Sequence, residues 1–157
     1  MSVMSTEPHA APWPPPRDDA MRVQLRYATL PAPIGMIAVH YWLVAWKGAA
    51  CHRWEVWQTK NAGGHSIGHV HCDLKPPDEG VGGGPAHIAA EWTGREAAAI
   101  HAVLDAVDRY PHCHRYIVWP GPNSNTFAAW VLKRAGIRHK LVWRALGKRF
   151  PVRSRKL

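Results

Sequence analysis

The pattern of hydrophobic and polar positions predicts several strands followed by two helices. Met21 to Tyr27 alternates apolar and polar residues, which is typical of a strand with one buried face. Gly35 to Trp46 is apolar on both alternating faces and therefore predicts a strand covered on both sides. Further strands are predicted at Cys51 to Gln58 and Ile67 to Asp73, with a short one at Tyr116 to Trp119.

Two helices are predicted in the second half of the chain. The segment Thr93-Gly94-Arg95-Glu96 has the form of a capping box, and a helical stripe of apolar residues follows it as far as Pro111. After the turn Pro120-Gly121-Pro122, a second helix is predicted at Asn123 to Ala135, with Gly136 as its stop. The order of strands, then helix, strand and helix predicts an α+β fold.

The length and composition fit one folded domain. A chain of 157 residues can bury about two thirds of its unfolded surface without a metal or a disulfide. Residues 1–20 contain the run Pro12-Trp13-Pro14-Pro15-Pro16 and are expected to form a disordered tail. We expect the domain to cover residues 21–150 and a basic tail to cover 151–157. Most of the nine tryptophans are expected in the core.

The cysteines and the apolar segments indicate a cytoplasmic protein. Cys51, Cys72 and Cys113 show no paired spacing, so no disulfide framework is expected. The N-terminus has no basic region followed by an apolar run, as a secretory signal would have. The longest apolar stretch, Ile34 to Trp46, is shorter than the roughly 20 residues that span a bilayer. No transmembrane segment is therefore predicted.

Positive charge is concentrated at the C-terminal end. The formal net charge is +9, and residues Lys133 to Leu157 contain ten Lys and Arg but no Asp or Glu. Such a segment is suited to an anionic partner such as nucleic acid, an anionic membrane or an acidic protein. A solvated helix face followed by a basic tail is the alternative interpretation.

Three residues are candidates for chemistry. Ser124 lies at the predicted start of a helix, where free N–H groups and the positive helix end can stabilise an oxyanion. The alternative is that Ser124 only caps the helix. His40 lies within an apolar strand and must find a polar partner, either as a core histidine or as a base beside Ser124. Glu55 is the candidate that orients His40, although it could instead pair with Arg53.

Two short stretches carry a resemblance to known families. His40-Tyr41-Trp42-Leu43-Val44, followed much later by Asn123-Ser124-Asn125-Thr126-Phe127, resembles the circularly permuted papain-like enzymes, which include NlpC-related and lecithin:retinol acyltransferase-like proteins. The motif Trp-Pro-Gly-Pro-Asn-Ser-Asn-Thr-Phe at 119–127 is similar to that of an uncharacterised bacterial family. The resemblance implies a permuted papain-like domain, with a small antiparallel sheet packed against two main helices.

The same resemblance implies roles for the candidate residues. His40 matches the family base, and Ser124 stands where those enzymes have a cysteine nucleophile. A serine hydroxyl does not ionise as a thiol does, so the site works by general-base catalysis or not at all. Asn123 and Asn125 are expected to line the site, with N–H groups near Asn125 contributing to an oxyanion site.

A second cluster of candidate ligands lies on the strand predicted at Ile67 to Asp73 and just before it. His69 and His71 have a spacing that can hold Zn²⁺ on one face of a strand, with His65, Cys72 and Asp73 nearby. Chance proximity is the competing explanation, because the chain has eleven histidines. No cofactor is predicted, and His69 and His71 are retained only as weak metal candidates.

These observations leave more than one function open. The first is a hydrolase or acyltransferase that attacks an amide, ester or thioester, with an unidentified small-molecule, peptide or lipid ligand. The second is a catalytically inactive binding or scaffold domain that uses a groove at the same candidate site to hold a ligand. The third is a basic module that binds nucleic acid or an anionic membrane through its C-terminal segment.

Overall fold

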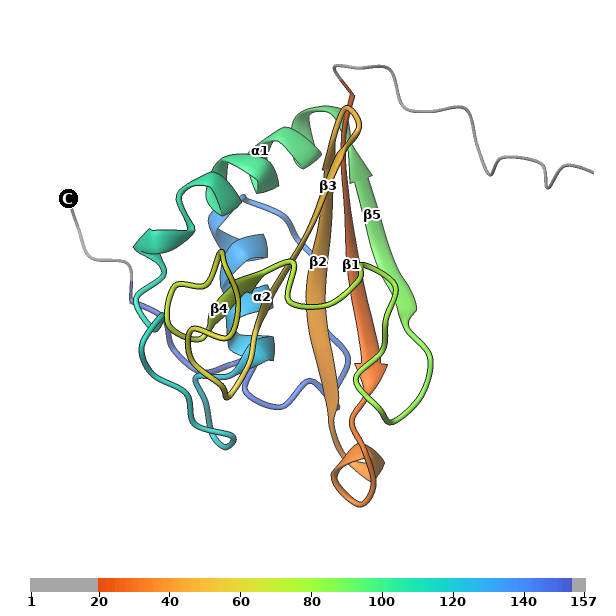
Figure 1. Ribbon diagram of the computed structural model, residues 1–157, viewed down its shortest axis with the longest axis vertical. Coiled ribbons are helices and arrows are strands. Elements are labelled where there is room, and N and C mark those ends of the chain that lie inside the picture. The colour runs from red at the N-terminus through yellow and green to blue at the C-terminus, as the bar shows by residue number, and fades with distance from the viewer. Residues whose placement is uncertain (1–19, 154–157) are drawn as a thin grey trace, which may run out of the picture.

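The computed structural model describes residues 20–153 as an antiparallel sheet with two helices on one side (Figure 1). The strand order is β4-β3-β2-β1-β5. The strands are β1 (Met21–Thr29), β2 (Val39–Lys47), β3 (Ala50–Val56), β4 (Val70–Cys72) and β5 (His87–Thr93), and the helices are α1 (Gly94–Asp105) and α2 (Ser124–Arg134). The predicted α+β class is confirmed. The predicted N-terminal tail, except Ala20, and residues 154–157 lie outside the described residues.

The main core lies between the sheet and the two helices. Alternate residues of β1 and β2 point into it, including Val23, Leu25 and Tyr41. The helices cover these residues with side chains at helical spacing, among them Ile100, Leu104, Phe127 and Val131. Each of these large apolar side chains contributes about 1.5–3 kcal/mol to folding when fully buried.

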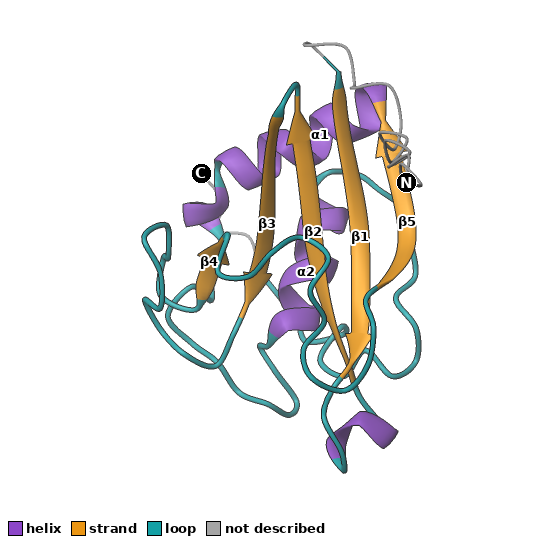
Figure 2. Ribbon diagram, turned by 45° about the vertical axis from the view of Figure 1, so that its right-hand side comes forward, coloured by secondary structure: helices purple, strands orange, loops and turns teal. Residues whose placement is uncertain are grey.

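The opposite face of the sheet is covered by a loop rather than by helices. The segment 73–86 crosses this face (Figure 2) and brings Val81 against Trp42 and Val44 of β2. The indole Nε1 of Trp42 donates a hydrogen bond of 3.0 Å to the carbonyl of Pro77 in this loop. The prediction that β2 is covered on both sides is therefore confirmed.

Two predicted strands begin later than expected. Gly35 and Met36 belong to a 3₁₀ turn, η1 (Ile34–Met36), and β2 begins only at Val39. A Cβ atom on Gly35 would lie 1.8 Å from the carbonyl oxygen of Leu30, so this close approach requires glycine. In the segment from Ile67, β4 is limited to Val70–Cys72, because Ile67 pairs back onto Val70 in a tight turn.

The prediction of a strand at Tyr116 to Trp119 is wrong. The N–H of Ile117 donates to the carbonyl of Pro122, so the segment folds back on its own proline-rich turn. The sequence analysis also missed β5, in which only Trp92 is buried. This edge strand has almost no hydrophobic alternation and is stabilised by pairing with β1.

The second helix begins and ends as predicted, and the first begins differently. Gly136 follows α2 with φ of +74°, a left-handed conformation that suits a residue after a helix. Thr93 precedes α1 but makes no capping hydrogen bond with its side chain, so the predicted capping box is absent. Gly94 has φ of +58° and takes the chain directly from β5 into the helix, without the regular first turn that a capping box requires.

The tryptophans are less buried than expected. Among those in the described part of the chain, Trp42, Trp92 and Trp130 are buried, whereas Trp119 and Trp143 are 66% and 74% exposed. Between residues 20 and 153, neither helix has the length and apolar composition that a bilayer crossing requires. The rings of Trp119 and Trp143 therefore lie mainly on the surface and contribute little to the core.

Candidate active site

A buried polar network joins β2 to β3 beneath the loop that covers the second face. Glu55 Oε2 lies 2.8 Å from His40 Nε2 and 2.9 Å from a terminal guanidinium nitrogen of Arg53. Arg53 and Glu55 are fully buried, and His40 is 4% exposed. The sequence left open whether Glu55 orients His40 or pairs with Arg53. In the structure the same carboxylate oxygen, Oε2, makes both contacts.

The surroundings keep Glu55 charged. Burial alone would raise the pKa of this carboxyl, but the hydrogen bonds and positive charges of His40 and Arg53 outweigh burial and lower the pKa below its ordinary value. An ionised carboxylate only accepts hydrogen bonds, so His40 Nε2 is the donor in their contact. His40 Nδ1 makes no hydrogen bond within the described residues and is the ring nitrogen left for another partner.

Arg53 ties the network to the covering loop. Its guanidinium donates to the carbonyls of Pro76 and Glu79, at 2.7 and 2.6 Å. The same group lies 4.2 Å from the ring centre of Trp42, in a cation–π contact. These contacts fix the position of the carboxylate that holds His40.

The start of α2 is attached to the strand at the position of His40. The Asn125 amide accepts from the N–H of Tyr41 at 3.1 Å and donates to the carbonyl of Val39 at 2.9 Å. These are the two neighbours of His40 along β2. The ladder between β2 and β3 extends only from Leu43 to Lys47, so the Asn125 side chain occupies the edge of β2 that β3 leaves open. Ser124 therefore begins a helix that is fixed to β2 on either side of His40.

The structure assigns the capping role to Asn123 rather than to Ser124. The Asn123 side chain accepts from the N–H groups of Asn125 and Thr126, and Thr126 Oγ1 accepts from the N–H of Asn123. A Cβ on Gly147 would lie 2.3 Å from the Asn123 amide, so this glycine makes room for the cap. The sequence interpretation in which Ser124 serves only as the cap is wrong, because its neighbour performs that role.

Ser124 and His40 each keep one polar atom free. Within residues 20–153, neither the Ser124 hydroxyl nor His40 Nδ1 has a hydrogen-bond partner, and the two side chains are not hydrogen-bonded to each other. Ser124 is 6% exposed. Neither atom is among the fully buried polar atoms that lack a hydrogen-bond partner.

The free amide at the start of α2 is that of Ser124 itself. The N–H of Asn125, a predicted oxyanion donor, already donates to Asn123 Oδ1 at 3.0 Å. The N–H of Ser124 has no acceptor within the described chain. Together with the positive end of the 11-residue helix, this amide is the group that can meet a negative oxygen.

A hydrogen-bonded serine–histidine pair that the sequence analysis missed joins the loop before β4 to β4 itself. Ser66 Oγ is 2.7 Å from His71 Nδ1, and His71 Nε2 is 2.8 Å from the carbonyl of Thr59. Burial lowers the pKa of His71, which therefore stays neutral and accepts from Ser66. Ser66 also accepts from the N–H of Gly63, so its hydroxyl has a structural role in the loop. A serine five residues before a histidine was the only signal for this pair.

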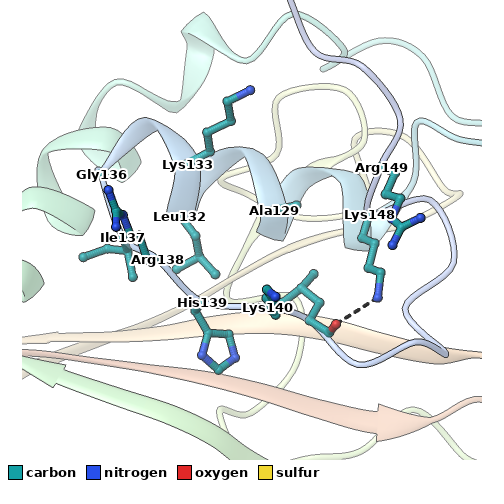
Figure 3. A pocket seen from close by; sticks show the side chains of 11 residues that line it. Ala129, Leu132, Lys133, Gly136, Ile137, Arg138, His139, Lys140, Lys148 and Arg149 are labelled. Carbon is teal, nitrogen blue, oxygen red and sulfur yellow. Dashed lines mark hydrogen bonds between the residues drawn. The ribbon is translucent and has the colours of Figure 1, made fainter.

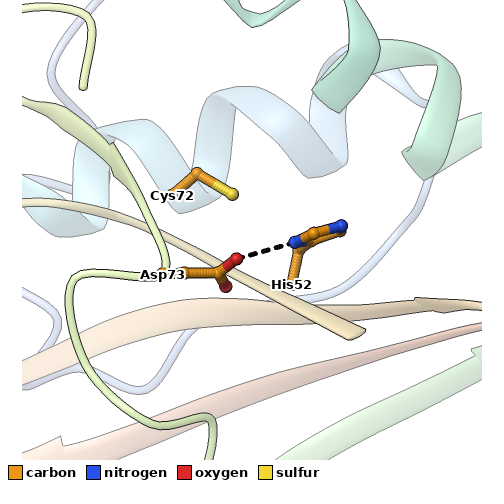
Figure 4. Close-up of side chains that lie close together, drawn as sticks. All are labelled: His52, Cys72 and Asp73. Carbon is orange, nitrogen blue, oxygen red and sulfur yellow. Dashed lines mark hydrogen bonds and ion pairs between the residues drawn. The ribbon is translucent and has the colours of Figure 1, made fainter. Parts of the chain in front are cut away.

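Within the described residues, the predicted metal candidates His69 and His71 belong to no group of three or more potential ligands. His69 Nδ1 contacts the carbonyl of Trp57, and both nitrogens of the His71 ring are engaged, by Ser66 and by Thr59. The potential ligand atoms that do gather, within 4.8 Å of one another, belong to His52, Cys72 and Asp73 (Figure 4).

The members of this second group contact one another and the backbone, and Cys72 is buried. Asp73 accepts from His52 at 2.7 Å and from the backbone N–H of Arg53. Burial and the charge of Asp73 raise the pKa of Cys72 to about 12, so its thiol keeps its proton at neutral pH.

Comparison with known proteins gives a family. The model of a family described as protein of unknown function DUF3750 matches residues 20–150, which is nearly the range predicted for the domain. No curated protein and no solved structure matches the chain. The matched range contains His40, Glu55 and Ser124. The chain therefore belongs to the DUF3750 family.

Proposed function

We propose that this protein is a serine-dependent hydrolase or acyltransferase that attacks an amide, ester or thioester carbonyl with Ser124. The observation that carries the proposal is the attachment of α2 to β2 by Asn125, at both neighbours of His40. This attachment brings the start of the helix to the strand position that bears an imidazole held by a buried carboxylate. In the same proposal the fold is a permuted papain-like one, in which a helix start meets a histidine-bearing strand.

The proposed chemistry uses His40 as general base and then as general acid. His40 Nδ1 takes the proton of Ser124 Oγ while the oxygen forms a bond to the carbonyl carbon, and the resulting imidazolium is stabilised by Glu55. The negative carbonyl oxygen of the tetrahedral intermediate is stabilised by the N–H of Ser124 and the helix end. His40 then protonates the leaving amine, alcohol or thiol, and water or an acceptor alcohol or amine removes the acyl group.

The cysteines are poor alternatives as nucleophiles. Burial raises the pKa of Cys51, Cys72 and Cys113, so all three thiols stay protonated at neutral pH. A reactive cysteine requires the opposite shift, toward the thiolate. Ser124, in contrast, begins a helix whose positive end can stabilise a negative oxygen, and in this proposal His40 supplies the base that an oxygen nucleophile needs.

Labelling with an alkyl fluorophosphonate tests this proposal without knowledge of the substrate. We expect the full chain to gain one phosphonyl adduct by intact mass, at Ser124 by peptide mapping, and Ser124→Ala to gain none. Ser66→Ala is the matched control, because Ser66 also contacts a histidine but lies in the loop between β3 and β4 rather than at the start of a helix. It should label as the unmodified chain does.

Each alternative gives a different labelling result. An adduct that moves to Ser66, or that persists in Ser124→Ala, would assign the nucleophile elsewhere and overturn the proposal. A chain that stays unlabelled at saturating probe while its folding is intact would instead support the catalytically inactive binding domain.

A further inference from the structure

A basic groove runs along α2 on the side that faces the segment after it (Figure 3). The groove has a volume of about 610 Å³ and an aliphatic floor that includes Leu132 and Leu141. Its walls carry several cations, namely Lys133, Arg138, Lys140, Lys148 and Arg149. From Lys133 to Arg153 the sequence has eight Lys and Arg and no Asp or Glu. In the described structure no carboxylate forms a salt bridge with these groove cations.

An apolar pocket adjoins this groove. It has a volume of about 570 Å³ and shares Lys148 and Arg149 with the groove. Trp119 and Trp143 line it together with Leu146 and Phe150, and both indole rings are largely exposed. Exposed aromatic rings of this size are unusual on a soluble surface and are typical of an interaction site.

The η1 turn extends the apolar surface beyond Trp143. The N–H of Val39 donates to the carbonyl of Arg144 at 3.1 Å, and the guanidinium of Arg144 donates to the carbonyl of Gly35. The turn is thereby held against Arg144, the residue that follows Trp143 in the chain. Met36 is 77% exposed, and Ile34 and Ile37 are more than half exposed. Exposed apolar side chains therefore lie on segments that adjoin the groove cations, none of which has a carboxylate partner in the described structure.

We infer that this surface, formed by the basic groove, the tryptophan-lined pocket and the η1 turn, binds an anionic lipid bilayer. Lysine and arginine side chains near a membrane are attracted to anionic headgroups, and indole rings favour the interface between headgroups and acyl chains. Aliphatic tips such as Met36 gain free energy when they leave water for the acyl region.

The aliphatic tips favour a bilayer over nucleic acid. Tryptophans beside cations could stack on the bases of a single strand, but exposed Ile and Met side chains make no comparable contact with phosphates or bases. Neither pocket is lined by His40 or Ser124, so this inference does not depend on the proposed chemistry.

Vesicle co-sedimentation of the full chain tests the inference. We expect binding to vesicles of phosphatidylcholine mixed with phosphatidylglycerol, and much weaker binding to phosphatidylcholine alone. The double variant Lys140→Glu with Arg149→Glu should bind the anionic vesicles at least about 30-fold more weakly, since each headgroup contact is worth a factor of about five. Trp143→Ala should weaken binding by about tenfold, because the ring no longer leaves water.

Matched controls separate the surface from general charge and from catalysis. Arg95→Glu changes an exposed cation on α1 that does not line the groove and should bind nearly as the unmodified chain does. Ser124→Ala should bind equally well. Equal binding to neutral and anionic vesicles, an unaffected double variant, or binding to a single-stranded oligonucleotide but not to vesicles would each overturn the inference.

Discussion

Replacing His40 by Gln is expected to slow phosphonylation of Ser124 by about 10²–10⁴-fold, the usual contribution of a positioned general base. A glutamine amide can still donate to Glu55, but it has no nitrogen that takes a proton at neutral pH. The rate of adduct formation by intact mass measures the effect, at a probe concentration below saturation. Thermal unfolding of the same samples shows whether the fold is retained.

Two outcomes would contradict this prediction. A His40→Gln chain that labels at the unmodified rate would show that Ser124 reacts without the imidazole. Equally slow labelling of His71→Gln would show that the loss is not specific to His40. The result expected is a loss specific to His40, with His71→Gln labelling normally.

Replacing Glu55 by Gln is expected to lower the free energy of unfolding by about 3–5 kcal/mol at neutral pH, the usual cost of breaking a buried ion pair. The reason is that Arg53 would remain fully buried without an opposite charge. Urea denaturation measures the change. Glu79→Gln is the matched control, because its pair with Lys75 is at 3.4 Å and partly exposed, and an exposed pair contributes about 0–1 kcal/mol.

The effect of Glu55 depends on pH in a definite direction. Its pKa is lowered in the folded chain, so its stabilisation is fully present above the ordinary value of 4.5 and is lost as pH falls through the folded pKa. The difference in stability between the unmodified chain and Glu55→Gln should therefore shrink in acid. A difference that stays constant from neutral pH to strong acid would contradict the assigned ion pair.

The fold was predictable where the local pattern and the tertiary packing agree. Both faces of β2 and one face of α2 carry apolar side chains that are stable only when buried. Both elements are present in the structure. β5 escaped prediction because its stability comes from pairing with β1, which no local pattern records. Tyr116 to Trp119 has the composition of a strand, but the prolines that follow remove the N–H groups that a ladder needs.

The sequence indicated which residues belong to the candidate site, but it did not predict most of the contacts that they make. An isolated histidine in an apolar strand requires a partner, and Glu55 on the neighbouring strand is the partner that the structure supplies. The hydrogen bonds by which Asn125 attaches α2 to β2 could not be predicted from the sequence. They depend on where β3 separates from β2. The exposure of Trp119 and Trp143 was equally hidden, since tryptophan is usually a core residue.

The central claim is that His40 and the side chain at position 124 act on each other at the start of α2. Ser124→Cys tests it directly, through the alkylation rate of the new thiol as a function of pH. The three native thiols have raised pKa values and should contribute little background.

We predict that the new thiol has a pKa below about 7.5, as cysteines paired with an imidazole at a helix start do, and that adding His40→Gln returns it toward about 8.5. A thiol that titrates at about 8.5 or higher, with or without His40, would contradict the claim.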